Sequence, residues 1–146
     1  MPTGADLQLQ LFDSSAAVPL LVHDHEFHGA VLDLAARSRR GLAGHAWFET
    51  YSILTRMPAG VRRSPTAVFT AMRSTFPETR FLEPDAVLAL RGELAERRIA
   101  GGAVYDALVA AVARQMDVPL VTCDRRARAT YEALGVRVHW PSRFDG

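Results

Sequence analysis

The chain has 146 residues, of which 49% are hydrophobic, and its formal net charge is +1. This length can bury a core that needs no disulfide or structural metal, and the single cysteine excludes an intrachain disulfide. The composition excludes a disordered protein, and no stretch approaches the ~20 apolar residues of a membrane span. We therefore expect one soluble domain over residues 1–146, and the lack of a signal-peptide pattern predicts a cytoplasmic protein.

Hydrophobic periodicity and helix-terminal signals predict strands that alternate with helices along the chain. In chain order we expect strand LQLQLF (7–12), a helix from Ser14 to about His23, a helix over about 27–38, a short strand or strand end in GLAGHA (41–46), a helix in WFETYSILTR (47–56), a helix beginning at Ser64 and Pro65, a short strand in TRFLE (79–83), a helix from Pro84 to about Arg98, helix AVYDALVAAVARQM (103–116), strand VPLVT (118–122), helix RRARATYEAL (125–134) and strand VRVHW (136–140). This order predicts an α/β fold with a parallel sheet covered on both faces, whose functional residues gather at the carboxyl ends of its strands.

The basic residues are all arginine, because the 17 basic residues include no lysine. A P-loop nucleotide site requires a lysine, and phosphoryl-transfer domains of the receiver and haloacid dehalogenase types also use one, so the sequence argues against all three. Guanidinium groups bind phosphate well, but arginine clusters such as Arg125, Arg126 and Arg128 are also typical of solvated surfaces. The sequence leaves both interpretations open.

Two carboxylates closely follow predicted strands. Asp13 comes directly after Phe12, and Asp124 follows Thr122 and Cys123. Because parallel strands end at the same edge of a sheet, we expect both carboxylates at one rim. Aspartate is also a favoured residue at a helix N-terminus, so each of them could instead cap the helix that follows.

Two further acids lie within predicted helices. Asp106 is the only acid of helix 103–116, which is otherwise apolar nearly all round. The helix dipole contributes at most ~2 kcal/mol, less than the cost of burying an ion, so another group must compensate its charge. Glu49 projects from a helical face of small and apolar residues and is expected to be half-buried, with a surface pair to Arg56 as the alternative.

Four carboxylates that converge repel one another unless they hold cations. Oxygen ligands without His or Cys favour Mg²⁺ or Mn²⁺. Paired ions of this kind activate water and stabilise the oxygens of a phosphodiester displacement. The set therefore predicts metal-dependent hydrolysis of a phosphodiester, and its members are Asp13, Glu49, Asp106 and Asp124.

Two other candidates carry less support. His23, His25 and His28 could suggest zinc, but they lie in a predicted loop between helices. Cys123 would need a neighbouring His base to act as a nucleophile, and His139 is the only His in the later part of the chain. We therefore expect Cys123 to be a small buried side chain.

The stretches LFDSS, FETYSILTR, YDALVAAVA and LVTCDRRARATYEALGV, in this order, resemble the PIN-domain ribonucleases, and specifically the VapC-type toxins of bacterial toxin–antitoxin modules. The resemblance extends over nearly the whole chain. It implies a three-layer α/β/α sandwich with a central parallel sheet and a Mg²⁺- or Mn²⁺-dependent endoribonuclease, in which metal-activated water cleaves RNA. It also implies a homodimer and a cognate antitoxin whose C-terminal tail blocks the site.

The resemblance assigns functional residues by position. Many relatives carry another acid or Asn shortly after the position of Asp124, where this chain has Arg125 and Arg126, which could contact substrate phosphate. A PIN-like domain with a degenerate site, acting as a protein- or RNA-binding module, is the alternative function, and the presence of all four acids argues against it. The catalytic, metal-binding residues implied are Asp13, Glu49, Asp106 and Asp124, and the small hydroxyl positions of the pocket are Ser14 or Ser15 and Thr122.

Overall fold

The structure, a computed structural model, describes residues 6–142. Its strands are β1 (Leu9–Phe12), β2 (Arg39–Leu42), β3 (Leu120–Val121) and β4 (Val138–His139). Its helices are α1 (Ser14–Leu21), α2 (His28–Ala35), α3 (His45–Thr55), α4 (Pro65–Thr75), α5 (Pro84–Glu96), α6 (Ala103–Met116) and α7 (Arg128–Ala133), with a short 3-10 helix η2 (Arg125–Ala127) before α7. Within this part of the chain, no helix is long and apolar enough to cross a membrane.

The four strands form one parallel sheet in the order β2-β1-β3-β4. β1 lies between its two partners, with Phe12 opposite Leu42 of β2 and opposite Val121 of β3. Because all strands run in the same direction, β1, β2 and β3 end at one edge, which we call the carboxyl edge. The predicted α/β fold with a parallel sheet is confirmed.

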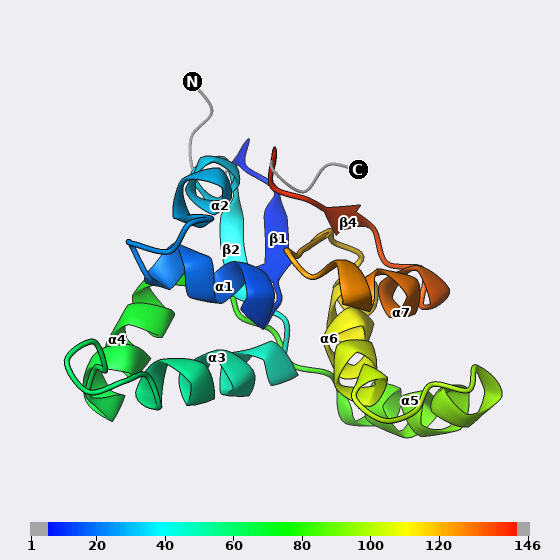
Figure 1. Cartoon of the computed structure of the whole chain (residues 1–146). Coiled ribbons are helices and arrows are strands. Elements are labelled where there is room, and N and C mark those ends of the chain that lie inside the picture. Colours follow the sequence, from blue (N-terminus) through cyan, green and yellow to red (C-terminus); the bar gives the residue numbers. More distant parts are fainter. Residues whose placement is uncertain (1–5, 143–146) are drawn as a thin grey trace.

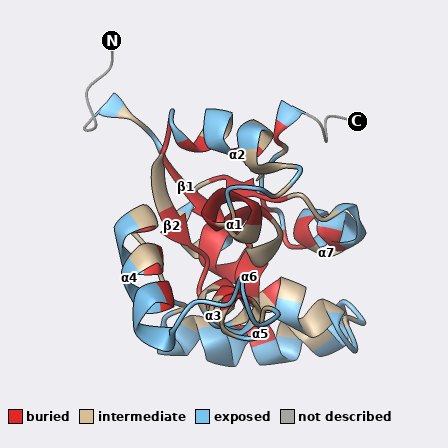
Figure 2. Cartoon of the chain, turned by 60° about the vertical axis from the view of Figure 1, so that its left-hand side comes forward, coloured by how far each residue is buried: buried red, intermediate tan, exposed pale blue. Residues whose placement is uncertain are grey.

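The sheet separates two hydrophobic cores, because alternate residues of a strand point to opposite faces. Leu9 and Leu11 belong to the core under α6 and α7, whereas Phe12 belongs to the core under α1, α2 and α4. Gln10 is buried and points to the same face of the sheet as Phe12, and its amide donates to Ser38 Oγ at 2.6 Å. Figure 2 shows buried residues concentrated on β1, β2, α1 and α6, while the outer faces of α4 and α5 are exposed.

Helix α3 crosses the carboxyl edge (Figure 1). Ala46, near its start, packs in the core with α6, and Leu54, near its end, packs in the core with α1 and α4. The helix therefore bridges both layers directly beyond the ends of the strands. Any side chain on its inward face is held close to the residues that follow β1 and β3.

Several predicted elements differ in the structure. The strands expected over 118–122 and 136–140 are shorter, as β3 and β4. The strand expected in 41–46 is β2, which begins at Arg39, and TRFLE forms a single bridge between Arg80 and Ala43 instead of a strand. The helix expected over 125–134 is divided into η2 and α7. Tertiary contacts explain the early start of β2, because the Arg39 side chain pairs with Glu78 at 2.7 Å and Arg40 donates to the Thr75 carbonyl at 2.9 Å.

Gly41 allows the segment after α4 to cover the outer edge of β2. Glu78 N donates to Arg40 O at 3.0 Å and Arg80 N donates to Leu42 O at 3.2 Å, so this segment satisfies backbone groups of the edge strand. A Cβ at position 41 would lie 2.0 Å from the Glu78 carbonyl oxygen. Only glycine permits this close approach of two backbones.

Candidate active site

Asp13 sits at the end of β1 and also caps α1. Its Oδ1 accepts hydrogen bonds from Ser15 Oγ at 2.6 Å and from the backbone N–H of Ala16 at 3.1 Å. Its Oδ2 accepts from the hydroxyl of Tyr131 at 2.7 Å. Burial raises the pKa of Asp13, and the hydrogen bonds from Ser15, Thr122, Tyr131 and Ala16 partly oppose that rise. The fold thus buries this carboxylate and supplies donors to it.

Asp124 follows β3 and caps η2. Its Oδ1 accepts from the backbone N–H of Arg126 at 3.0 Å, and its own N–H donates to Thr122 Oγ1 at 3.0 Å. The capping interpretation is therefore right for both strand-end acids. Capping does not remove either acid from the carboxyl edge, because an N-cap residue stands where the strand ends and the helix begins.

A chain of hydroxyl groups joins the two strand ends. Ser15 Oγ, which donates to Asp13, also accepts from the backbone N–H of Cys123 at 2.8 Å and lies 3.2 Å from Thr122 Oγ1. Thr122 in turn accepts from Asp124. The loops that carry Asp13 and Asp124 are therefore held in fixed relation by Ser15 and Thr122.

Asp106, in the first turn of α6, faces the same edge. Burial and, in decreasing order, the charges of Asp124, Glu49 and Asp13 together raise the pKa of Asp106 to about 6, while the charge of Arg126 opposes the rise. Within residues 6–142, no hydrogen-bond donor reaches the Asp106 carboxylate. Its ionised form is therefore less well compensated by the fold than that of Asp13.

Glu49 reaches the edge from α3. The backbone turns from β2 into α3 at Gly44, whose φ of 51° favours glycine and whose added Cβ would lie 2.8 Å from Val112. Burial raises the pKa of Glu49, His45 and Ser14 oppose the rise, and the charge of Asp13 adds to it. The basic side chain beside Glu49 is His45, whose Nε2 lies 3.8 Å from Glu49 Oε1, rather than the Arg56 that the sequence suggested.

The four acids thus lie at the carboxyl edge, where Asp106 is within electrostatic reach of the other three. The charges of the other three acids raise the pKa of Asp106, and the charge of Asp13 raises the pKa of Glu49. In the described part of the chain, no three or more His, Cys, Asp or Glu side chains lie close enough together to hold a metal ion as they stand. The structure therefore brings the predicted acids to one edge, and their metal-binding and catalytic roles stay predictions.

The two arginines after Asp124 differ in their contacts. Arg126 Nε lies 3.4 Å from Asp124 Oδ1, although its side chain is 94% exposed, and Arg125 is exposed in η2. Arg126 therefore places positive charge beside the acids while most of its guanidinium faces solvent. A phosphate contact from either residue stays a prediction.

The other candidates have local partners. His28 Nδ1 hydrogen-bonds the Pro19 carbonyl at 2.8 Å, and His25 Nδ1 accepts from the backbone N–H of Phe27 at 3.1 Å. Burial and the charge of Asp13 raise the pKa of the half-buried Cys123 thiol to about 12. A thiol that stays protonated at neutral pH is a poor nucleophile.

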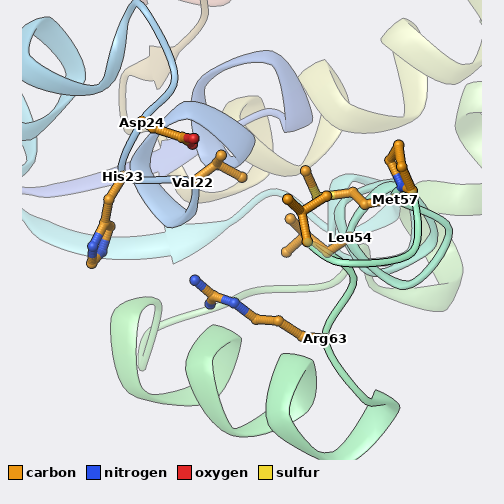
Figure 3. Close-up of a pocket in the computed structure, with 8 residues that line it drawn as sticks. Val22, His23, Asp24, Leu54, Met57 and Arg63 are labelled. Atoms are coloured by element: carbon orange, nitrogen blue, oxygen red, sulfur yellow. The ribbon is translucent and has the colours of Figure 1, made fainter.

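A cavity of about 590 Å³ lies at the carboxyl-terminal ends of α1 and α3 (Figure 3). Apolar side chains of Val22, Leu54 and Met57 line it, and Arg63 extends into it from the start of the α4 segment. None of the four acids belongs to its lining. This cavity is therefore a second surface feature, separate from the carboxyl edge.

Tyr131 is the residue of this site that the sequence did not reveal. It lies in α7, 118 residues from Asp13, and its ring is buried while its hydroxyl donates to Asp13. Burial, followed by the charge of Asp13, raises the pKa of Tyr131, so the phenol stays a donor. A buried tyrosine in a helix gives no local signal of such a partner.

Comparison with known proteins identifies the family. Residues 11–133 match the PIN domain, which spans all four acids and Tyr131. The chain belongs to the PIN domain family. Ribonuclease VapC27 of Mycobacterium tuberculosis is 43% identical over 126 residues, which cover 86% of this chain and 92% of that protein. Ribonuclease VapC40 of the same species is 40% identical over 128 residues, covering 86% of this chain and 94% of VapC40.

Solved structures of other proteins share the fold. M. tuberculosis VapC20, a sarcin-ricin loop cleaving toxin, matches with a TM-score of 0.65 at 20% identity and covers 82% of this chain and 93% of VapC20. FitAcB from Neisseria gonorrhoeae matches with a TM-score of 0.65 at 19% identity, covering 90% of this chain and 97% of that chain. The resemblance of this sequence to VapC-type PIN proteins and the predicted fold are confirmed.

Proposed function

We propose that this chain is the toxin of a type II toxin–antitoxin module and cleaves RNA with Asp13, Glu49, Asp106 and Asp124 as its catalytic and metal-binding residues. The names of its relatives, VapC27 and VapC40 ribonucleases, support RNA cleavage. The observation that best supports this site is the pKa of Asp106, which burial and the charges of the other three acids raise to about 6. Carboxylates gathered at such a cost are typical of a functional site.

The donor set fits Mg²⁺ or Mn²⁺. The four side chains offer carboxylate oxygens, which these hard cations prefer, and their mutual repulsion would be relieved by positive charge. When bound, such an ion activates water and stabilises negative charge on the phosphodiester oxygens. The side chains that would hold it are those of Asp13, Glu49, Asp106 and Asp124.

The protein itself positions these acids and the substrate. The hydroxyls of Ser15 and Thr122 hold the ends of β1 and β3 together, so the spacing of Asp13 and Asp124 is set by backbone and hydrogen bonds. Arg126, beside Asp124 and largely exposed, is suited to attract an RNA phosphate toward the edge. This chain needs no nucleophilic side chain for the reaction.

Asp106→Asn is the direct test of the function. Purified wild-type protein should cleave RNA in the presence of Mg²⁺ or Mn²⁺, and EDTA should stop the cleavage. Expression of the protein without an antitoxin should arrest growth of the host. Asp106→Asn should lose cleavage and relieve the arrest, whereas Asp33→Asn, which removes the same charge from an exposed position of α2, should do neither. Undiminished cleavage in EDTA by a nuclease-free preparation would refute the metal-dependent mechanism.

A protein partner is part of the proposal. One structural match is the VapBC2 complex of Rickettsia felis bound to a promoter DNA fragment, with a TM-score of 0.64 at 14% identity. We infer a cognate antitoxin for this chain, and the apolar cavity of Figure 3 is suited to receive an apolar side chain of it. Met57→Asp should weaken antitoxin binding in a pull-down and leave RNA cleavage intact.

We also infer a homodimer. Phe48 and Phe81 are 56% and 51% exposed, and their ring centroids lie 6.2 Å apart on the outer side of α3. Exposed aromatic side chains that cluster in this way commonly mark a protein interface. Sedimentation analysis of the purified chain measures its oligomeric state directly. Phe48→Glu should shift the equilibrium from dimer toward monomer.

A further inference from the structure

Tyr131 is a buried residue that contacts Asp13 and has no role yet in the proposed function. It is 1% exposed, and its ring is part of the core formed by the sheet, α6 and α7. A phenol hydroxyl in such a core needs a hydrogen-bond partner. The partner here is Asp13 Oδ2, at 2.7 Å, and the charges of Asp106 and Asp124 also reach the phenol.

The Asp13 carboxylate is held from two directions. Ser15 Oγ and the N–H of Ala16 bind Oδ1 from the start of α1, whereas Tyr131 binds Oδ2 from α7. The terminal torsion of an aspartate has only a broad preference, so one anchored oxygen still leaves the carboxylate plane free to turn. A donor on the second oxygen removes that freedom, and core packing fixes the position of this donor.

We propose that Tyr131 is a positioning residue, whose buried hydroxyl fixes the plane of the Asp13 carboxylate so that it meets a divalent cation in one orientation. The proposal rests on the proposed function, since it takes Asp13 as a metal ligand. Partners that orient a ligand through a hydrogen bond contribute to metal affinity although they do not touch the ion. Tyr131 would act on RNA cleavage only through Asp13.

Calorimetric titration with Mn²⁺ tests the proposal without relying on activity. Tyr131→Phe keeps the ring and removes the hydroxyl, and we expect its dissociation constant for Mn²⁺ to rise about 10-fold. The matched control is Tyr51→Phe, which removes a hydroxyl from α3, where the ring stacks on Trp47, and it should bind Mn²⁺ as the wild type does. At saturating Mn²⁺, Tyr131→Phe should lower kcat for RNA and leave KM unchanged.

The outcomes separate this proposal from the proposed function. If the wild type binds Mn²⁺ and cleaves RNA, but Tyr131→Phe has the same dissociation constant and kcat, the positioning role is overturned and the function stands. If the wild type binds no Mn²⁺, the proposed function fails and the role of Tyr131 fails with it.

A second measurement uses only wild-type protein and does not depend on the variant's folding. The hydroxyl proton of Tyr131, donated to a buried carboxylate, should give a separate downfield proton resonance. We expect Mg²⁺ titration to shift it in step with the amide signals of the carboxyl edge. A hydroxyl resonance that stays fixed while those amides shift would overturn the proposal.

Discussion

Replacing Asp106 with Asn should stabilise the metal-free protein above neutral pH. The carboxylate lies half-buried in the first turn of α6, and the other three acids raise its pKa together with burial. Asparagine has almost the same shape and carries no charge. In EDTA at pH 8, we therefore expect Asp106→Asn to unfold at a higher temperature than the wild type.

The size of the effect follows from the pKa. A rise from 3.8 to about 6 would correspond to about 3 kcal/mol for a fully shielded group. Because Asp106 is only half-buried, solvent screening reduces this to about 1 kcal/mol. For a chain of 146 residues, 1 kcal/mol shifts the melting temperature by about 3 °C.

The sign of the pH dependence is fixed by the direction of the pKa. The folded-state pKa of Asp106 is raised, so ionisation costs stability above about pH 6, and protonation removes this cost as the pH falls from 6 toward 4. The advantage of Asp106→Asn should therefore disappear by about pH 4.

Thermal melts of both proteins across this range, with Asp33→Asn as the control, measure the effect. Mn²⁺ at 100 times its dissociation constant should stabilise the wild type by about 2.7 kcal/mol and reverse the order. An Asn variant that melts several degrees below the wild type in EDTA would refute the reasoning.

Two further predictions concern the surface and the fold. Arg126→Ala should weaken RNA binding and reduce the salt slope of the binding constant by about one unit, while Arg91→Ala, on the exposed face of α5, should leave the slope nearly unchanged. A slope that Arg126→Ala does not alter would assign this arginine to the solvated surface. Gly41→Ala should lower the free energy of unfolding by about 2 kcal/mol or more, because its Cβ would meet the Glu78 backbone. Gly92→Ala, within α5 and with open space around it, should raise that free energy by about 1 kcal/mol, and denaturant titrations compare the two.

The parts of the site that could be predicted have local signals. Asp13 and Asp124 each follow a short apolar run, and an acid after a buried strand stands out in the sequence. Asp106 stands out because its helix is otherwise apolar. The structure brings these acids to one edge since the strands are parallel and α6 begins beside them.

The parts that could not be predicted depend on distant partners. Arg39 and Arg40 begin β2 although the apolar pattern starts later, because Glu78 and the Thr75 carbonyl accept their hydrogen bonds. The contact between Tyr131 and Asp13 joins residues 118 positions apart. A short window of sequence cannot reveal these contacts, because only the folded chain brings the partners together.

The acids at the carboxyl edge are unequal in the support that the fold gives them. Asp13 receives hydrogen bonds from Ser15, Ala16 and Tyr131, so its carboxylate is held although it is buried. Asp106 receives none from the described residues, and its pKa stands at about 6. A site built to be stable without a ligand would supply donors to both. The uneven distribution is what we expect if Asp13 is a fixed part of the fold and the charge of Asp106 is left to be balanced by a cation that arrives from solvent.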